Sequence, residues 1–187
     1  MEAVNKTSKN EKIIKLTLLA IVSTILITVS AKVKIPFYPV PMTMQTFVIL
    51  LIGISFGYRF GLAIVSLYLI EGIVGLPVFA SSPEKGIGIA YFVGPTMGYL
   101  IGFLIAVYFA GFFKYNKGII NTFLKLIFSV SFIYIFGLLW LGILIGWDKP
   151  IFKLGAEPFL LAELFKILLL TVLTPSILKA KKLLKIT

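Results

Sequence analysis

The sequence predicts an all-α integral membrane protein with six transmembrane helices, long loops on the outer side and both termini in the cytoplasm. Of the 187 residues, 59% are hydrophobic, and the mean hydropathy of +1.07 is far above that of soluble domains. The apolar residues fall into six runs that glycine, proline and charged residues separate. Such runs are expected when helices cross a bilayer in series.

The chain is basic, with 18 Lys+Arg against 7 Asp+Glu, and it contains no cysteine or histidine. In a soluble domain this charge would suggest nucleic acid. Here most basic residues lie in loops and terminal segments, where they orient helices and meet anionic lipid headgroups, so we expect membrane lipid and no nucleic acid as a partner. Without Cys and His, disulfides, thiolate nucleophiles and the usual zinc ligands are excluded. We expect no metal and no catalytic residue.

The first elements are a polar tail over residues 1–12 and an apolar run over 13–31. The tail shows no apolar periodicity and predicts a mobile cytoplasmic segment. The run is long enough to span a bilayer. Its Lys-rich flank and the ending Val29-Ser30-Ala31 also resemble a signal peptide, although the flank equally suits a retained first helix.

The second and third runs, 43–56 and 62–74, are separated by the tight basic turn 57–61. Both are short for a span. The segment 75–93 that follows is too interrupted by glycine and proline to cross the membrane. A long, partly apolar loop of this kind often forms a lid over a binding site.

The fourth, fifth and sixth runs cover 96–113, 119–145 and 158–174. They complete a membrane domain over 13–180, after which 181–187 is a basic cytoplasmic tail. The fifth run exceeds the ~30 Å hydrocarbon core at about 1.5 Å per residue, so we expect it to tilt or protrude.

The distribution of basic residues predicts the orientation. One of the 18 Lys+Arg residues, Lys166, lies within the sixth run and is not counted. If both termini are cytoplasmic, five of the others lie on the outer side and twelve (18 − 1 − 5) lie on the cytoplasmic side. This asymmetry favours the cytoplasmic termini. The five predicted outer residues are Lys32, Lys34, Lys85, Lys149 and Lys153.

Two ionisable residues, Glu163 and Lys166, lie one helical turn apart inside the sixth run. Charges at membrane depth are costly, so they indicate function. The alternative is a self-neutralising pair that lets a polar face pack in the bundle. Glu71, near the outer end of the third run, is the remaining acid at membrane depth, and a capping or loop-anchoring role is the simpler interpretation.

Polar and aromatic residues near the predicted outer ends of the helices complete a candidate small-molecule site. Apolar walls with a few convergent polar groups are typical of such sites, although each aromatic alone also fits a core or bilayer-interface role. The polar candidates are Thr43, Gln45, Ser81, Thr96 and Tyr99, and the aromatic candidates are Phe79, Tyr91 and Phe159.

Small residues recur at four-residue spacing, as in Gly53, Gly57 and Gly61 or Gly94, Gly98 and Gly102. This spacing lets membrane helices approach closely, within the chain or in a dimer, and we favour packing within the chain. A similar face on the first helix is predicted to contact a partner protein. Its residues are Ala20, Ser23 and Thr24.

Four segments in register resemble the BioY family, the biotin-binding S components of energy-coupling-factor (ECF) transporters. They are 39–46 (Pro-Val-Pro-Met-Thr-Met-Gln-Thr), 75–79 (Gly-Leu-Pro-Val-Phe), 94–103, and Gly155-x-x-Pro-Phe with an acid and Lys166 beyond it. Two positions depart from the family pattern: Glu163 stands where Asp is usual, and Met97 replaces a glycine. The resemblance implies six helices in a prokaryotic cell membrane and capture of biotin from outside. It also implies a transmembrane coupling (T) component and two ATPase subunits as partners, and no cofactor.

Biotin offers a ureido carbonyl flanked by two N–H donors, an apolar bicycle and a carboxylate tail. Lys166 can only donate and ionised Glu163 can only accept, so the pair complements the ureido group. The reverse pose, with the carboxylate on Lys166, stays open. So do an S component for another vitamin, an intramembrane hydrolase, and a channel or structural subunit. The sequence contains no Gly-x-x-x-x-Gly-Lys-Ser/Thr phosphate-binding loop, so ATP-driven transport would need partner ATPases.

Overall fold

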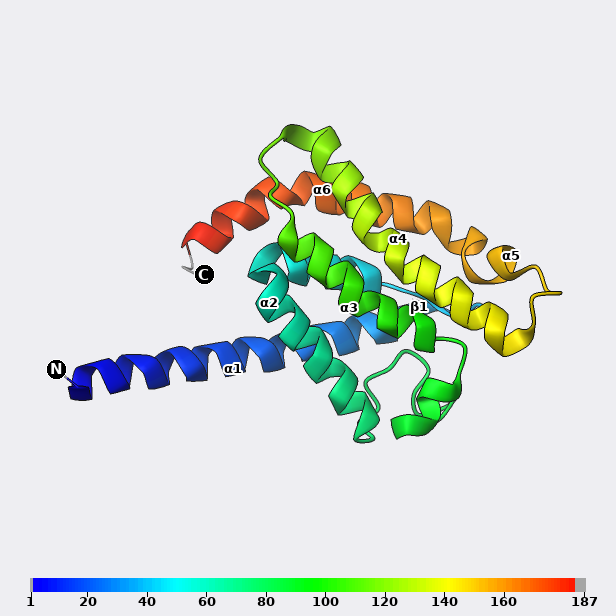
Figure 1. Cartoon of the computed structure of the whole chain (residues 1–187), viewed down its shortest axis with the longest axis horizontal. Coiled ribbons are helices and arrows are strands. Elements are labelled where there is room, and N and C mark those ends of the chain that lie inside the picture. Colours follow the sequence, from blue (N-terminus) through cyan, green and yellow to red (C-terminus); the bar gives the residue numbers. More distant parts are fainter. Residues whose placement is uncertain (1, 184–187) are drawn as a thin grey trace.

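Helices form most of the described chain, and Figure 1 shows them coloured from the N-terminus to the C-terminus. A computed structural model describes residues 2–183, with side chains from Asn10 onward. The long helices are α1 (Glu2–Lys32), α2 (Gln45–Ile73), α3 (Met97–Phe112), α4 (Gly118–Ile145) and α6 (Leu160–Leu183). Shorter elements are β1 (Lys34–Ile35), antiparallel to β2 (Met42–Thr43), the 3₁₀ helix η1 (Gly88–Val93), α5 (Ile151–Gly155) and η2 (Glu157–Phe159).

Four of the described helical segments are long and apolar enough to cross a membrane, namely Asn10–Lys32, Gln45–Ile73, Gly118–Ile145 and Ile151–Leu183. α3 is apolar but shorter, with 16 residues. The protein is therefore a multi-pass membrane protein. The predicted run 119–145 coincides with α4 to within one residue.

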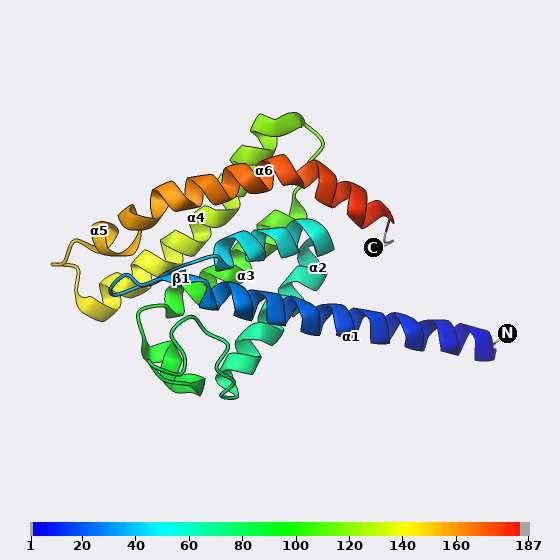
Figure 2. The same ribbon diagram turned by 180° about the vertical axis from the view of Figure 1, so that it is seen from behind.

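The predicted second and third runs are joined in the structure as α2, which changes direction at Gly57 (Figure 2). Gly57 has φ 78° and ψ 171°, a conformation that side chains with a Cβ rarely adopt. The backbone of Gly111 in α3 packs directly against the backbone of Gly57 and Tyr58. The chain therefore changes direction within α2 at Gly57, and no separate loop connects the two predicted runs.

Two predicted helix ends are wrong. α1 already begins at Glu2, so the segment expected to be a mobile tail is helical. Extending a formed helix needs no new nucleus, which explains how a polar segment can continue an apolar one. α6 passes through Pro175 to Leu183, beyond the end of the sixth predicted run at residue 174. Residues 184–187 of the predicted basic tail lie outside the described part of the chain.

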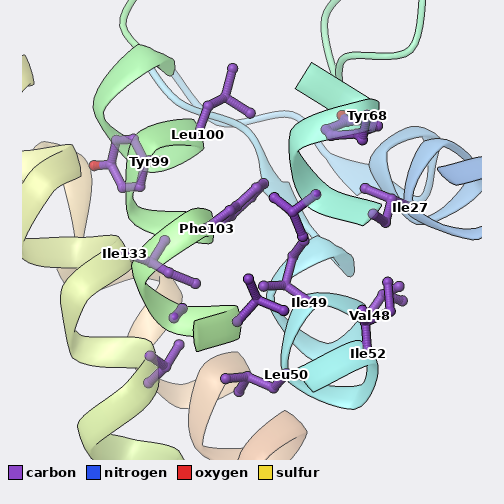
Figure 3. Close-up of a cluster of buried hydrophobic side chains, with 14 of the residues drawn as sticks. Ile27, Val48, Ile49, Leu50, Ile52, Tyr68, Tyr99, Leu100, Phe103 and Ile133 are labelled. Carbon is purple, nitrogen blue, oxygen red and sulfur yellow. The ribbon is translucent and has the colours of Figure 1, made fainter. Parts of the chain in front are cut away.

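The core lies where α2, α3 and α4 meet, and it is built on close backbone approach. Figure 3 shows Ile49 of α2 on the side that faces Phe103 of α3 and Ile133 of α4. A Cβ on Gly53 would lie 2.8 Å from the carbonyl oxygen of Val107, and one on Gly102 would lie 2.5 Å from the Cα of Ile133. These glycines therefore pack inside the chain, as predicted, and do not form a dimer face.

Gly102→Ala tests this packing. The added methyl group has no room between α3 and α4, so we expect a loss of about 1–3 kcal/mol in unfolding free energy, the usual cost of overpacking. The measurement is thermal unfolding of the purified protein in detergent. Ala63→Val, at an exposed position of α2, adds comparable bulk and should leave the transition unchanged. Equal stability of both variants would contradict the close α3–α4 contact.

Candidate ligand-binding site

A pocket lies between α2, α3, α4 and α6, and residues from the loops before α2 and α3 close it. Its open volume is about 60 Å³, below the roughly 300–1,000 Å³ typical of small-molecule sites. A bicyclic ligand therefore needs the walls to move apart. The lining residues are Val40, Pro41, Met42, Thr43, Gln45, Thr46, Ala80, Tyr91, Thr96, Tyr99, Leu100, Phe103, Ile133, Tyr134, Phe159, Glu163 and Lys166.

The charged pair Glu163–Lys166 forms the polar end of this pocket. The two residues are only 4% and 8% exposed, and Lys166 Nζ lies 3.0 Å from Glu163 Oε2. Lys166 Nζ also donates to the carbonyl oxygen of Thr43 at 3.0 Å and to Thr46 Oγ1 at 2.9 Å. An ammonium group has three N–H donors, so groups of the chain already engage all of them.

The carboxylate of Glu163 is satisfied on one oxygen only. Oε2 accepts hydrogen bonds from Lys166, from Thr46 Oγ1 and from Tyr134 Oη, each at 3.0 Å. Oε1 is buried and has no hydrogen-bond partner among the described residues. A buried acceptor without a partner is costly. Oε1 is therefore the atom of this pair that is free to accept an N–H from a ligand.

A second polar chain connects α2 to the 75–93 loop. Gln45 Nε2 donates to Tyr68 Oη at 2.8 Å, and Tyr68 donates to the carbonyl oxygen of Val78 at 3.2 Å. Gln45 is 4% exposed and Tyr68 is fully buried. Because Gln45 lines the pocket, these two bonds fix the loop relative to the pocket wall.

Eight of the ten predicted site residues line the pocket, and Phe79 and Ser81 do not. Phe79 packs under the loop, 4.7 Å from the ring of Tyr91 and edge-on to Tyr68. Ser81 lines a smaller neighbouring cavity together with Tyr91 and Thr96. The loop is folded back so that Tyr91, rather than Phe79, presents its side chain to the pocket.

Two residues at the charged pair, Thr46 and Tyr134, were not predicted. Thr46 follows Gln45 within the 39–46 segment, and its hydroxyl at the start of a helix was an available signal. Tyr134 is one aromatic in the long apolar run of α4. No spacing in the sequence distinguishes it, because its role depends on how α4 packs against α6.

Comparison with known proteins identifies the family. The model of the BioY family matches residues 4–183. This chain belongs to the BioY family. The resemblance carried by the four segments is thereby confirmed.

Known relatives of this BioY chain extend over most of its length. It is 36% identical over 141 residues to the probable biotin transporter BioY of Pyrococcus horikoshii, which covers 75% of this chain and 82% of that protein. It is 34% identical to the biotin transporter BioY of Thermotoga maritima, over 77% of this chain and 84% of that protein. A crystal structure of the S-component for biotin from an ECF-type ABC transporter has the same fold, with a TM-score of 0.75 and 24% identity over 91% and 94% of the two chains.

Glu71 of this BioY chain takes no part in the pocket. Its Oε1 accepts a hydrogen bond from Thr24 Oγ1 at 2.9 Å, which ties α1 to the second half of α2. Ser23 and Thr24 are 5% and 2% exposed, and Ala20 is half-buried against the core. The small-residue face predicted to meet a partner is thus turned toward the BioY chain itself.

Two lysines hold the loop over the pocket. Lys32 Nζ, at the end of α1, donates to the carbonyl oxygens of Phe79 and Ser82, both at 2.7 Å. Lys34 Nζ donates to the carbonyl oxygen of Ala80 at 2.8 Å and lies 3.8 Å from Glu84 Oε2. Ala80 lines the pocket, so α1 and the strand after it are fastened to the pocket wall.

Lys32→Met tests this attachment. The variant keeps the length of the side chain but removes both hydrogen bonds, each worth about 1.5–3 kcal/mol for a charged donor. We expect backbone amides of residues 79–84 to exchange with deuterium at least about tenfold faster than in the wild type. Lys153→Met, at an exposed position of α5, is the control. Unchanged exchange in Lys32→Met would show that the loop holds its place without this lysine.

Proposed function

We propose that this protein is the S component of an ECF-type transporter that captures biotin at the outer face of a prokaryotic cell membrane. It is a transport component and not an enzyme. The observation that carries the proposal is the buried Glu163–Lys166 pair, which leaves one carboxylate oxygen free at the end of an apolar and aromatic pocket. Membership of the BioY family and the similarity to biotin transporters support biotin as the ligand.

The hydrogen bonds favour the ureido group at the charged pair. The free acceptor Oε1 of Glu163 matches a ureido N–H, whereas the three donors of Lys166 are engaged within the chain. A ligand carboxylate at Lys166 would have to displace one of these bonds and would also lie near the charge of Glu163. The ureido carbonyl can share Lys166 with less electrostatic cost.

The proposed topology has six crossings: α1, the two halves of α2 on either side of Gly57, α3, α4 and α6. Both termini lie in the cytoplasm, since this orientation places most basic residues inside. Arg59 then lies at the cytoplasmic face, two residues beyond the break in α2. The pocket opens outward, and the 75–93 loop acts as its lid. Lys32 and Lys34, on the outer side, are engaged by carbonyl oxygens of this loop.

Uptake against a gradient needs an energy source that this sequence lacks, because it has no phosphate-binding loop. We infer that a T component and two ATPase subunits supply it. We place the partner contact on α1 at Ala20, which is half-buried, because its predicted neighbours Ser23 and Thr24 are turned toward the chain itself. α1 projects beyond the other helices toward its N-terminal end (Figures 1 and 2), so a partner can reach this part of the helix.

The purified protein should bind biotin with one site per chain and should not hydrolyse ATP. The measurement is isothermal titration in detergent with biotin, thiamin and riboflavin in parallel, together with a phosphate-release assay. Heat with thiamin or riboflavin and none with biotin would make the protein an S component for another vitamin. No binding of any of the three would favour a membrane subunit without a transport ligand.

Lys166→Met should weaken biotin binding by about 3 kcal/mol or more, the scale for removing one partner of a buried, hydrogen-bonded charge pair. Glu163→Asp should be milder because the charge and the acceptor remain. Glu163→Gln should lie between them, because the amide keeps an acceptor oxygen but not the charge.

Biotin methyl ester separates the two poses in the same titrations. If the ureido group binds at the Glu163–Lys166 pair, esterification should change the binding free energy by the same amount in wild type and in Lys166→Met. If the ester binds wild type much more weakly than biotin does, and Lys166→Met binds both equally, Lys166 holds the carboxylate.

Ala20→Trp should prevent co-purification with the T component and ATPases and leave biotin binding intact, because a large side chain blocks close helix approach. Val29→Trp, at an exposed position nearer the outer end of α1, serves as the control and should co-purify normally. Loss of biotin binding together with co-purification would assign Ala20 to packing within the chain.

A further inference from the structure

Three hydroxyl or ammonium donors converge on a single oxygen of Glu163, and they come from three different helices. Thr46 belongs to α2, Tyr134 to α4 and Lys166 to α6, and each lies 3.0 Å from Oε2. Two of them also bond to each other, since Lys166 Nζ donates to Thr46 Oγ1 at 2.9 Å. Of these three donors, Tyr134 alone belongs to α4.

The ring of Tyr134 is itself held in place by a second tyrosine. Tyr99 lies edge-on to it, with ring centroids 6.3 Å apart, and the hydroxyl of Tyr99 donates to the carbonyl oxygen of Gly155 at 2.8 Å. Gly137 lets the Tyr99 ring pack directly on the α4 backbone. Tyr134 therefore approaches Glu163 from a fixed position.

A carboxylate on a glutamate side chain turns easily about its last torsion, because that rotation has broad minima. A donor on the α4 side removes this freedom. We propose that Tyr134 is a positioning residue that determines ligand specificity: it holds Oε2, so that the unpaired Oε1 faces the pocket and demands an N–H donor from the ligand. The inference rests on the proposed function and deepens it. The ligand class that this arrangement selects is a cyclic urea or amide with a free N–H.

Two consequences follow for recognition. A ligand that presents only acceptors leaves Oε1 unpaired and buried, so the pocket rejects it. The Tyr134 hydroxyl donates a hydrogen bond to Glu163, and its oxygen retains lone pairs that can accept a second N–H from the ligand. Without Tyr134 only Thr46 and Lys166 hold the carboxylate, so its plane can turn about the last torsion. The advantage of a ligand with N–H donors then decreases because the acceptor is less preorganised.

The test compares biotin with an analogue methylated on both ureido nitrogens, by titration of the full-length protein in detergent. Wild type should bind biotin at least about tenfold more tightly than the analogue. Tyr134→Phe should weaken biotin about tenfold, as expected for one hydrogen bond to a charged group, and should reduce the preference over the analogue. Tyr115→Phe, which loses a hydroxyl bonded to the carbonyl oxygen of Ala110, is the matched control and should change neither value.

Glu163→Asp supplies an independent arm. Its carboxylate is withdrawn by about one C–C bond, roughly 1.5 Å, and no longer reaches Tyr134. Adding Tyr134→Phe to Glu163→Asp should therefore cause no further loss. Should Tyr134→Phe not fold, Tyr134→Leu takes its place in the same titrations: a reduced preference for biotin over the analogue supports the inference, and an unchanged preference overturns it.

An unchanged preference in a folded Tyr134→Phe, or an equal loss in both backgrounds, would overturn the role of Tyr134 while leaving biotin capture in place. Absence of biotin binding by wild type would instead overturn the proposed function, and this inference with it.

Discussion

The ion pair between Glu163 and Lys166 is the constraint on which the rest of the site depends. Two charges in an apolar bundle are tolerated only when partners surround them, and removing one partner leaves the other uncompensated. The chain surrounds the pair with Thr46 of α2, Tyr134 of α4 and Thr43 of β2. One acceptor, Glu163 Oε1, has no partner among the described residues, so the chain does not fully offset the cost of burying this pair.

This arrangement relies on helices that approach more closely than ordinary side chains allow. Gly98 and Gly102 bring α3 against the backbone of α4, and Gly53 brings α2 against α3. These contacts fix where α4 faces α6 across the pocket. The 3.0 Å hydrogen bond between Tyr134 and Glu163 therefore depends on glycines that do not line the pocket. Packing of the bundle and geometry of the charged pair are connected in this way.

The sequence alone predicted the parts of the site that are unusual for a membrane helix. Glu163 and Lys166 are conspicuous because ionisable residues are rare at that depth, and the pocket-lining aromatics were found for their place near the outer ends of the helices. Tyr134 could not be found, because a tyrosine in a long apolar run is common and its contact depends on packing between helices. Phe79 was predicted to line the site, but its loop folds so that the ring packs against Tyr68 and Tyr91 and does not line the pocket. Helix ends were missed where a polar segment or Pro175 continued a helix already formed.

Lys32 and Lys34 hold the loop through main-chain oxygens of Phe79, Ala80 and Ser82. Every amino acid supplies such an oxygen, so the attachment does not depend on which side chains the loop carries. The loop side chains at the pocket can therefore differ without loss of these lysine contacts. Attachment of the loop and the chemistry that it presents to the pocket are thus separable properties of this chain.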